Sequence, residues 1–200
     1  HWAIWHTSLL YDAADFLGNA YLYTGDIRYG RVGAILIDRI ADVYPDMFTG
    51  PTFPLFAHSD STQPKGKIVG CIWQHGLTRA FVLGYDAFYD AYDNPKVLEY
   101  IQQQSSRHSN LPFDKSNAIS IRENIEERLI LQTYKDIRNG NIHGNFGMHQ
   151  SAMALAAVVL DTYPETDIML DWITKYSVTS KEPALNTGGG VNQRLIEDVS

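Results

Sequence analysis

The chain has 200 residues, 44% of them hydrophobic, and a formal net charge of −7. This length and apolar content suffice for one substantial globular domain. The negative charge argues against a general nucleic-acid-binding protein, because such proteins carry a basic face. The single cysteine, Cys71, excludes an internal disulfide framework. No stretch predicts a membrane span or a signal peptide. With the negative charge, we therefore expect neither nucleic acid nor a membrane as partner.

In the first half of the chain, apolar residues at helical spacing predict three helices, over about 3–23, 27–43 and 69–92. Asp26 is placed to cap the second of these helices, and Pro45 follows its end. The stretch after that proline, up to about residue 67, is rich in Pro, Gly, Ser and Thr. We expect a long loop there, and long loops in compact domains are often functional.

The second half predicts four more helices, over about 95–104, 118–138, 147–162 and 167–177. Ser120 and Glu123 have the spacing of a capping box near the start of the second of these; the alternative is that this helix starts a turn earlier. The third is hydrophobic around nearly its whole circumference, which predicts burial on most sides.

No stretch alternates convincingly between apolar and polar residues, so the fold class is all-α. An apolar helix that ends in a Tyr-containing polar turn recurs roughly every 70 residues, and each is followed by a shorter predicted helix. Repeated helix pairs of this kind close into an (α/α) toroid or stack as a solenoid.

Residues 141–150, Asn-Ile-His-Gly-Asn-Phe-Gly-Met-His-Gln, hold the densest group of titratable and amide side chains. Histidine is the side chain most easily tuned for proton transfer near neutral pH, and glycine lets the backbone pass close to a ligand or adopt positive φ. One interpretation is a catalytic or binding site. The other is a polar turn whose asparagines cap the following helix.

Three segments resemble the helical domain of the heparinase II/III-like polysaccharide lyases. They are the Ala-Tyr-Leu-Tyr-Thr-Gly-Asp-Ile-Arg-Tyr segment at 20–29, the helix at 73–92 with its Tyr-Asp-Ala, and Asn-x-His-Gly-Asn-Phe-Gly-x-His-Gln at 141–150. The first two are generic to (α/α) toroids, and the third is specific.

The resemblance implies that residues 1–200 form a single, partial helical domain, an incomplete (α/α) toroid. It implies β-elimination of an acidic, uronate-containing polysaccharide such as heparan sulfate or alginate, in a periplasmic or secreted bacterial enzyme. Family members also carry a C-terminal β-sandwich, which supplies a catalytic Tyr and a further His. No such segment follows the Gly188-Gly189-Gly190 turn, so we expect this chain to be part of a larger enzyme.

Carried over by position, the resemblance assigns the chemistry to His143 and Asn145, which would neutralise the uronate carboxylate and handle the protons. It places His149 beside them as a third catalytic candidate. The substrate-binding candidates are Asn141, Gln150, Gln74, His75 and Arg79. Neither a cofactor nor a metal ion is expected, because His143 and His149 lack a carboxylate at metal-ligand spacing.

Two other functions remain open from the sequence. A glycoside hydrolase on the same toroid would use a carboxylate pair, with Asp86 and Asp90 as candidates. A non-catalytic carbohydrate-binding domain would bind sugar without turnover, and its aromatic residues, such as Trp2, Trp5 and Trp73, suit either stacking on sugars or core packing.

Overall fold

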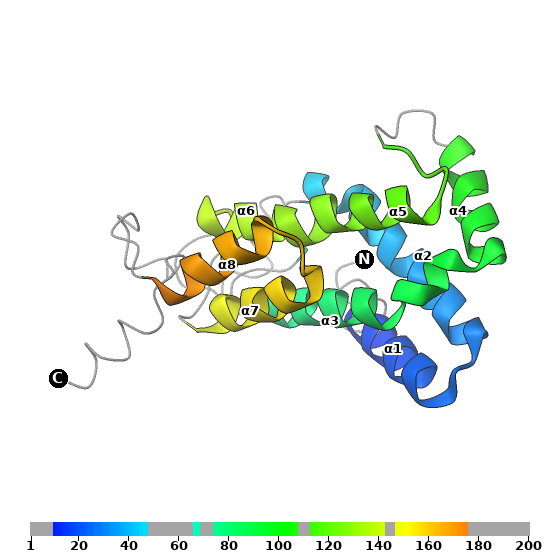
Figure 1. The fold of residues 1–200 in the computed structure, drawn as a ribbon, viewed down its shortest axis with the longest axis horizontal. Coiled ribbons are helices and arrows are strands. Elements are labelled where there is room, and N and C mark those ends of the chain that lie inside the picture. Colours follow the sequence, from blue (N-terminus) through cyan, green and yellow to red (C-terminus); the bar gives the residue numbers. More distant parts are fainter. Residues whose placement is uncertain (1–9, 48–65, 69–73, 108–112, 143–146, 176–200) are drawn as a thin grey trace, which may run out of the picture. The chain divides into compact units, whose positions relative to one another are not determined.

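The computed structural model describes residues 10–47, 66–68, 74–107, 113–142 and 147–175. All regular elements in these ranges are helices, which confirms the all-α prediction (Figure 1). The chain divides into two compact units, and the expectation of a single partial domain stays a prediction. Unit 1 contains the described residues up to 46 together with 80–132, and unit 2 contains 66–79 and 133–175.

Unit 1 begins with the hairpin of α1 (Asp12–Thr24) and α2 (Ile27–Val43). The bounds of α2 match the predicted helix, and Asp26 caps it by accepting a hydrogen bond from the Arg28 amide at 2.9 Å. A 3₁₀ turn, η2 (Tyr44–Asp46), ends this segment at the expected proline. Residues 1–9 of the predicted first helix lie outside the described residues.

The helix predicted over 69–92 ends earlier as an α-helix in the structure, and its residues 69–73 lie outside the described residues. Its α-helical part, α3, is Gln74–Ala87, and a 3₁₀ helix, η5 (Tyr89–Asp93), follows it. Helix α4 (Pro95–Arg107) comes next, and the Asn94 side chain accepts a hydrogen bond from the Lys96 amide at its start. Proline is well tolerated at this first helical position because the amide it lacks would have no partner within the helix.

The predicted helix over 118–138 is one helical stretch with a π-helical centre. It consists of α5 (Ala118–Ile125), the π-helix η6 (Glu126–Leu131) and α6 (Gln132–Arg138). The predicted capping box of Ser120 with Glu123 is wrong. Asn117 is the cap, because its Oδ1 accepts from the Ser120 amide at 3.0 Å while Ser120 Oγ accepts from the Asn117 amide at 3.3 Å.

Unit 2 pairs α7 (Met148–Leu160) with α8 (Glu165–Thr174). One side of α7 is fully buried through Ala152, Met153 and Ala156. From α6, the ring of Tyr134 meets the ring of Trp172 on α8 edge to face, at 5.6 Å between centroids.

Helices follow the polar turns of the predicted repeat, which supports the helix-pair interpretation. In the first pair α2 has 17 residues. The start of the helix before it falls on residues 1–9, which lie outside the described residues, so the expected shortening of the second helix stays a prediction there. The toroid arrangement stays a prediction.

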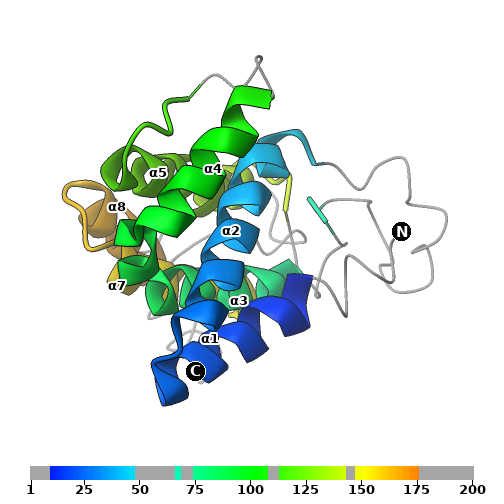
Figure 2. The same ribbon diagram turned by 90° about the vertical axis from the view of Figure 1, so that its right-hand side faces the viewer.

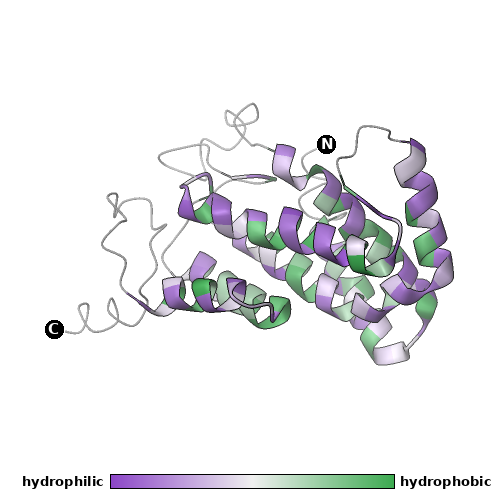
Figure 3. Cartoon of the chain, turned by 45° about the horizontal axis from the view of Figure 1, so that its top comes forward, coloured by the Kyte–Doolittle hydropathy of each residue, from purple (hydrophilic) through white to green (hydrophobic). Residues whose placement is uncertain are grey.

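Helix α2 is the centre of unit 1, since it contacts α1, α4, α5 and η5 (Figure 2). Hydrophobic and hydrophilic residues are interspersed along the helices (Figure 3), and the buried hydrophobic residues of α2 include Ile37 and Ile40. The closest approach is at Gly33, where a Cβ would lie 2.0 Å from Cζ of the fully buried Phe88. Glycine at this position therefore lets the Phe88 ring lie directly against the backbone of α2.

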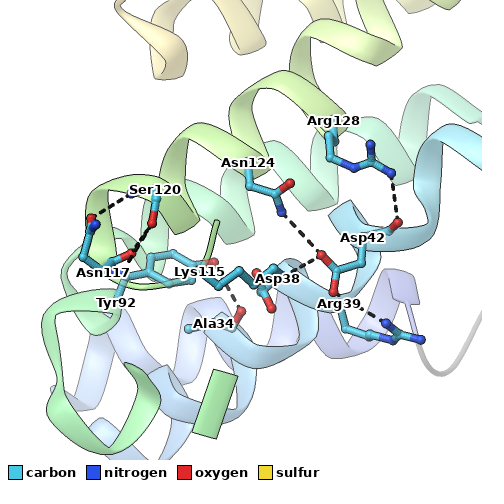
Figure 4. Close-up of polar contacts among 10 residues, drawn as sticks. All are labelled: Ala34, Asp38, Arg39, Asp42, Tyr92, Lys115, Asn117, Ser120, Asn124 and Arg128. Atoms are coloured by element: carbon cyan, nitrogen blue, oxygen red, sulfur yellow. Dashed lines mark hydrogen bonds and ion pairs between the residues drawn. The ribbon is translucent and has the colours of Figure 1, made fainter. Parts of the chain in front are cut away.

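A buried lysine attaches the segment before α5 to the same helix. Lys115 Nζ donates to Asp38 Oδ1 at 2.6 Å and to Asp42 Oδ1 at 2.5 Å, and all three side chains are at most 8% exposed (Figure 4). Asn124 of α5 and Arg128 of η6 add hydrogen bonds to the Asp42 side chain and carbonyl. Charges buried this deeply are tolerated because each is paired.

Among the described residues, no helix is both long enough and apolar enough to cross a membrane.

We predict that Gly33→Ala lowers the free energy of unfolding by roughly 1–3 kcal/mol, because the new methyl group must displace the Phe88 ring. Gly18→Ala on α1 is the matched control. Its methyl group would meet Ala87 Cβ at an ordinary 3.5 Å, so the better helix propensity of alanine should raise stability by about 0.5–1 kcal/mol. Urea unfolding of both variants measures this, and equal effects would contradict the packing described.

Asp38 should make stability fall as pH rises. Burial raises the pKa of its carboxyl from the ordinary 3.8 to about 6, although Lys115 opposes the shift. The folded state then holds this proton more tightly than the unfolded chain, so stability is greatest below pH 4 and falls through about pH 6. Asn at this position cannot titrate. Between pH 4 and 7, the unfolding free energy of the wild type should therefore fall by roughly 2–3 kcal/mol relative to that of Asp38→Asn. Urea unfolding at each pH measures both, and a constant difference between the two proteins would contradict the raised pKa of Asp38.

Candidate functional site

Six of the eight predicted site residues are described, and all six belong to unit 2. Gln74, His75 and Arg79 lie in the first turns of α3. The other three, Asn141, His149 and Gln150, flank residues 143–146. The two leading catalytic candidates, His143 and Asn145, lie outside the described residues.

Asp136 fixes the chain on the N-terminal side of residues 143–146. Its carbonyl oxygen accepts from the Asn141 and Ile142 amides at 2.8 and 3.2 Å. Its Oδ1 accepts from Asn141 Nδ2 at 3.0 Å, while its Oδ2 pairs with Lys67 Nζ at 3.3 Å. The Lys67 and Asp136 side chains are 9% and 5% exposed. Asn141 therefore serves as a turn residue here, with its amide bound by Asp136.

Gln150 fixes the chain on the C-terminal side. Its Oε1 accepts from the Gly147 amide at 2.8 Å, and its side chain is buried. Gly147 has a φ of 90°, a backbone conformation that side-chain-bearing residues rarely adopt. Of the two uses of glycine considered for this stretch, close passage to a ligand or positive φ, Gly147 shows the second. Both flanks of the predicted catalytic segment are thus held by polar contacts from buried side chains, Asp136 and Gln150.

Gln74 extends this network to the start of α3. Its fully buried side chain accepts from the Lys67 and Ile68 amides through Oε1, at 3.3 and 3.1 Å. Because Lys67 also pairs with Asp136, three segments of unit 2 are connected through side chains: the start of α3, residues 67–68 and the turn after α6. In this arrangement Gln74 positions backbone, as Gln150 does.

His75 and His149 form a pair of rings. Their centroids are 6.3 Å apart and their planes lie at 89°, within the usual range for edge-to-face contact. His149 is fully buried, whereas His75 is partly exposed. A proton carrier at the surface of this pair would therefore be His75, with His149 behind it.

The remaining candidates lie on exposed positions. Arg79 is exposed and lies one helical turn after His75. In unit 1, the proposed hydrolase carboxylates Asp86 and Asp90 are both exposed, and Asp90 accepts from Tyr21 Oη at 3.0 and 3.1 Å. They lie on different elements, α3 and η5. Trp2, Trp5 and Trp73 lie outside the described residues.

Sequence reasoning missed Lys67 and Asp136, the central pair of the network. Lys67 ends the stretch expected to be a functional loop, and Asp136 lies five residues before Asn141. A buried ion pair between such distant positions has no periodic signature. Of the two residues, only Lys67 lies in a segment that was expected to be functional, the predicted long loop.

The described residues contain no group of three or more His, Cys, Asp or Glu side chains that could hold a metal ion. Comparisons of the chain with protein-family models, with curated proteins and with solved structures find no match.

We predict that Asp136→Asn lowers the free energy of unfolding by about 3 kcal/mol or more, because Lys67 loses a buried counter-charge. The double variant Lys67→Met/Asp136→Asn should recover part of that loss, since it removes the Lys67 ammonium together with its counter-charge. As the matched control, Lys175→Met removes the exposed pair with Asp171 and should cost at most about 1 kcal/mol. Thermal and urea unfolding give these values, and an Asp136→Asn effect as small as that of the control would contradict the network.

Proposed function

We propose that this chain is the helical part of a polysaccharide lyase that cleaves an acidic, uronate-containing glycan by β-elimination. The observation that carries the proposal is the anchoring of the Asn-x-His-Gly-Asn-Phe-Gly-x-His-Gln stretch on both sides. Asp136 holds Asn141, and Gln150 holds Gly147. Catalytic groups must be held in place by such supporting contacts, because small displacements cost rate.

The reaction has three requirements. The uronate carboxylate must be neutralised so that the C5 proton becomes acidic, a base must remove that proton, and an acid must protonate the leaving glycosidic oxygen. We assign charge stabilisation to the Asn145 amide, because preorganised donors stabilise charge that develops in the transition state. His143 is suited to proton transfer, since its imidazole exchanges protons near neutral pH.

The described residues would support these two groups. The buried His149, in contact with His75, would orient the segment it follows and connect it to a ring that reaches the surface. Gln74, Asn141 and Gln150 would hold backbone through the contacts described above, and Arg79 would offer an exposed cation for a substrate carboxylate or sulfate.

In this proposal the rest of the enzyme lies outside these 200 residues. A C-terminal β-sandwich would contribute the remaining catalytic Tyr and His, and the helical part would be an incomplete (α/α) toroid. Such an enzyme would work outside the cytoplasm, in the bacterial periplasm or medium, where acidic polysaccharides are found.

The protein with its natural flanking sequence should produce an unsaturated, ultraviolet-absorbing product from at least one of heparan sulfate, alginate, hyaluronan and pectin. His143→Ala should lower that rate by about 10²–10⁴-fold, because the variant loses general acid–base catalysis. His108→Ala, which changes a histidine outside the motif, is the matched control and should keep the wild-type rate. Absorbance at the wavelength of the conjugated double bond follows both variants.

New reducing ends without ultraviolet absorbance would replace the lyase with a hydrolase. Binding of these glycans without any product would replace it with a carbohydrate-binding domain. Full activity of His143→Ala would remove this residue from the catalytic set.

A further inference from the structure

Unit 1 contains a cavity of about 230 Å³ between α2, α4 and the segment before α5. Its charged lining consists of Asp38, Arg39, Asp42 and Lys115, and Tyr100, Gln104 and Ser105 add polar groups. The volume is below the roughly 300–1,000 Å³ of pockets for drug-sized ligands, so the cavity suits a smaller molecule. The cavity belongs to unit 1, whereas the described residues of the proposed catalytic site belong to unit 2.

The wall formed by α2 is built from buried charges. Asp38, Asp42 and Lys115 are 5%, 7% and 4% exposed, and Figure 4 shows their side chains pointing toward one another. Both aspartates use Oδ1 for Lys115. Among the described residues, Lys115 is the only hydrogen-bond partner of Asp38, so Asp38 Oδ2 keeps its capacity to accept. A buried carboxylate oxygen beside a cavity is a strong acceptor for a ligand hydroxyl.

The opposite wall is held in place by its own contacts. Gln102 of α4 donates to the Ser116 carbonyl at 2.6 Å, which connects α4 to the segment that carries Lys115. Gln104 and Ser105, which face the cavity from α4, are half-buried. Ile101 adds an apolar surface that is almost fully buried. Donors, acceptors and a small apolar surface therefore line the same space.

The charges select against ionic ligands. Two aspartates and the cations Lys115 and Arg39 line the cavity, and the formal sum of these four charges is zero. An anionic ligand would meet two carboxylates, and a cationic ligand would meet an ammonium group that both carboxylates already neutralise. A neutral ligand with several hydroxyl groups meets neither penalty.

We propose that this cavity binds one neutral, polyhydroxylated ring, either a free sugar or a single sugar unit of a glycan. Asp38 Oδ2 accepts from one ligand hydroxyl, and Arg39, which is partly exposed, donates to a ligand oxygen. Gln104 and Ser105 both donate and accept, and Ile101 contacts an apolar face of the ring. This site is independent of the proposed lyase chemistry, because no residue of that chemistry takes part in it.

The test uses amide chemical shifts of the isotopically labelled protein during titration with glucose, mannose, galactose and inositol. One of these should give saturable shifts that centre on Asp38, Arg39, Gln104 and Ser105. Ser105→Phe places a ring in the cavity and should weaken this binding at least tenfold. Gln103→Phe, one position earlier on the exposed face of α4, is the matched control and should change it less than twofold.

Gln104→Ala provides a second, smaller change and should weaken binding at least threefold even if Ser105→Phe disturbs folding. Saturable binding of a monosaccharide but not of its neutral oligosaccharides would identify a free sugar as the ligand. Equal or tighter oligosaccharide binding would identify a sugar unit of a glycan. Absence of saturable shifts, preference for glucuronate or putrescine, or unchanged binding in both cavity variants would overturn the proposal.

Discussion

Pairing of buried lysines with aspartates is the interaction on which both units depend. In unit 1, Lys115 is neutralised by Asp38 and Asp42 on α2. In unit 2, Lys67 is neutralised by Asp136 on α6. Each lysine comes from an irregular segment and each aspartate from a helix, so the pairing attaches non-helical chain to helical framework. Such pairs add little net stability, but losing one partner is costly because an uncompensated charge stays buried.

The consequence for function differs between the units. In unit 2, the aspartate that neutralises Lys67 also binds Asn141, so ion pairing and the geometry of the proposed catalytic segment depend on the same side chain. In unit 1, the paired charges line a cavity instead, and their balance determines which ligand chemistry fits there. Helices supply the rigid positions in both cases, because polar side chains on regular elements are held more firmly than those on loops.

Helical periodicity predicted the fold class and most elements, because burial of one helix face leaves a repeating pattern in the sequence. The bounds of α2 followed from Asp26 and Pro45, whose backbone effects are local. The 3₁₀ and π segments, such as η5 and η6, were not predicted, since they are short local variations at or within helices. The candidate site was found through its density of His, Asn and Gln. Its support by Lys67 and Asp136 was not, because an ion pair between residues 69 positions apart has no local signature.

The most direct test of the proposed chemistry is the fate of solvent oxygen during cleavage. Elimination breaks the glycosidic bond without adding water, whereas hydrolysis adds one water oxygen to each new reducing end. The protein with its natural flanking sequence would digest a uronate-containing glycan in water enriched in heavy oxygen. Mass spectrometry of the products then distinguishes elimination from hydrolysis, provided that they are analysed before their reducing ends exchange oxygen with the solvent. A lyase should give products without label and with a new double bond. Incorporation of one heavy oxygen per cleavage would contradict it.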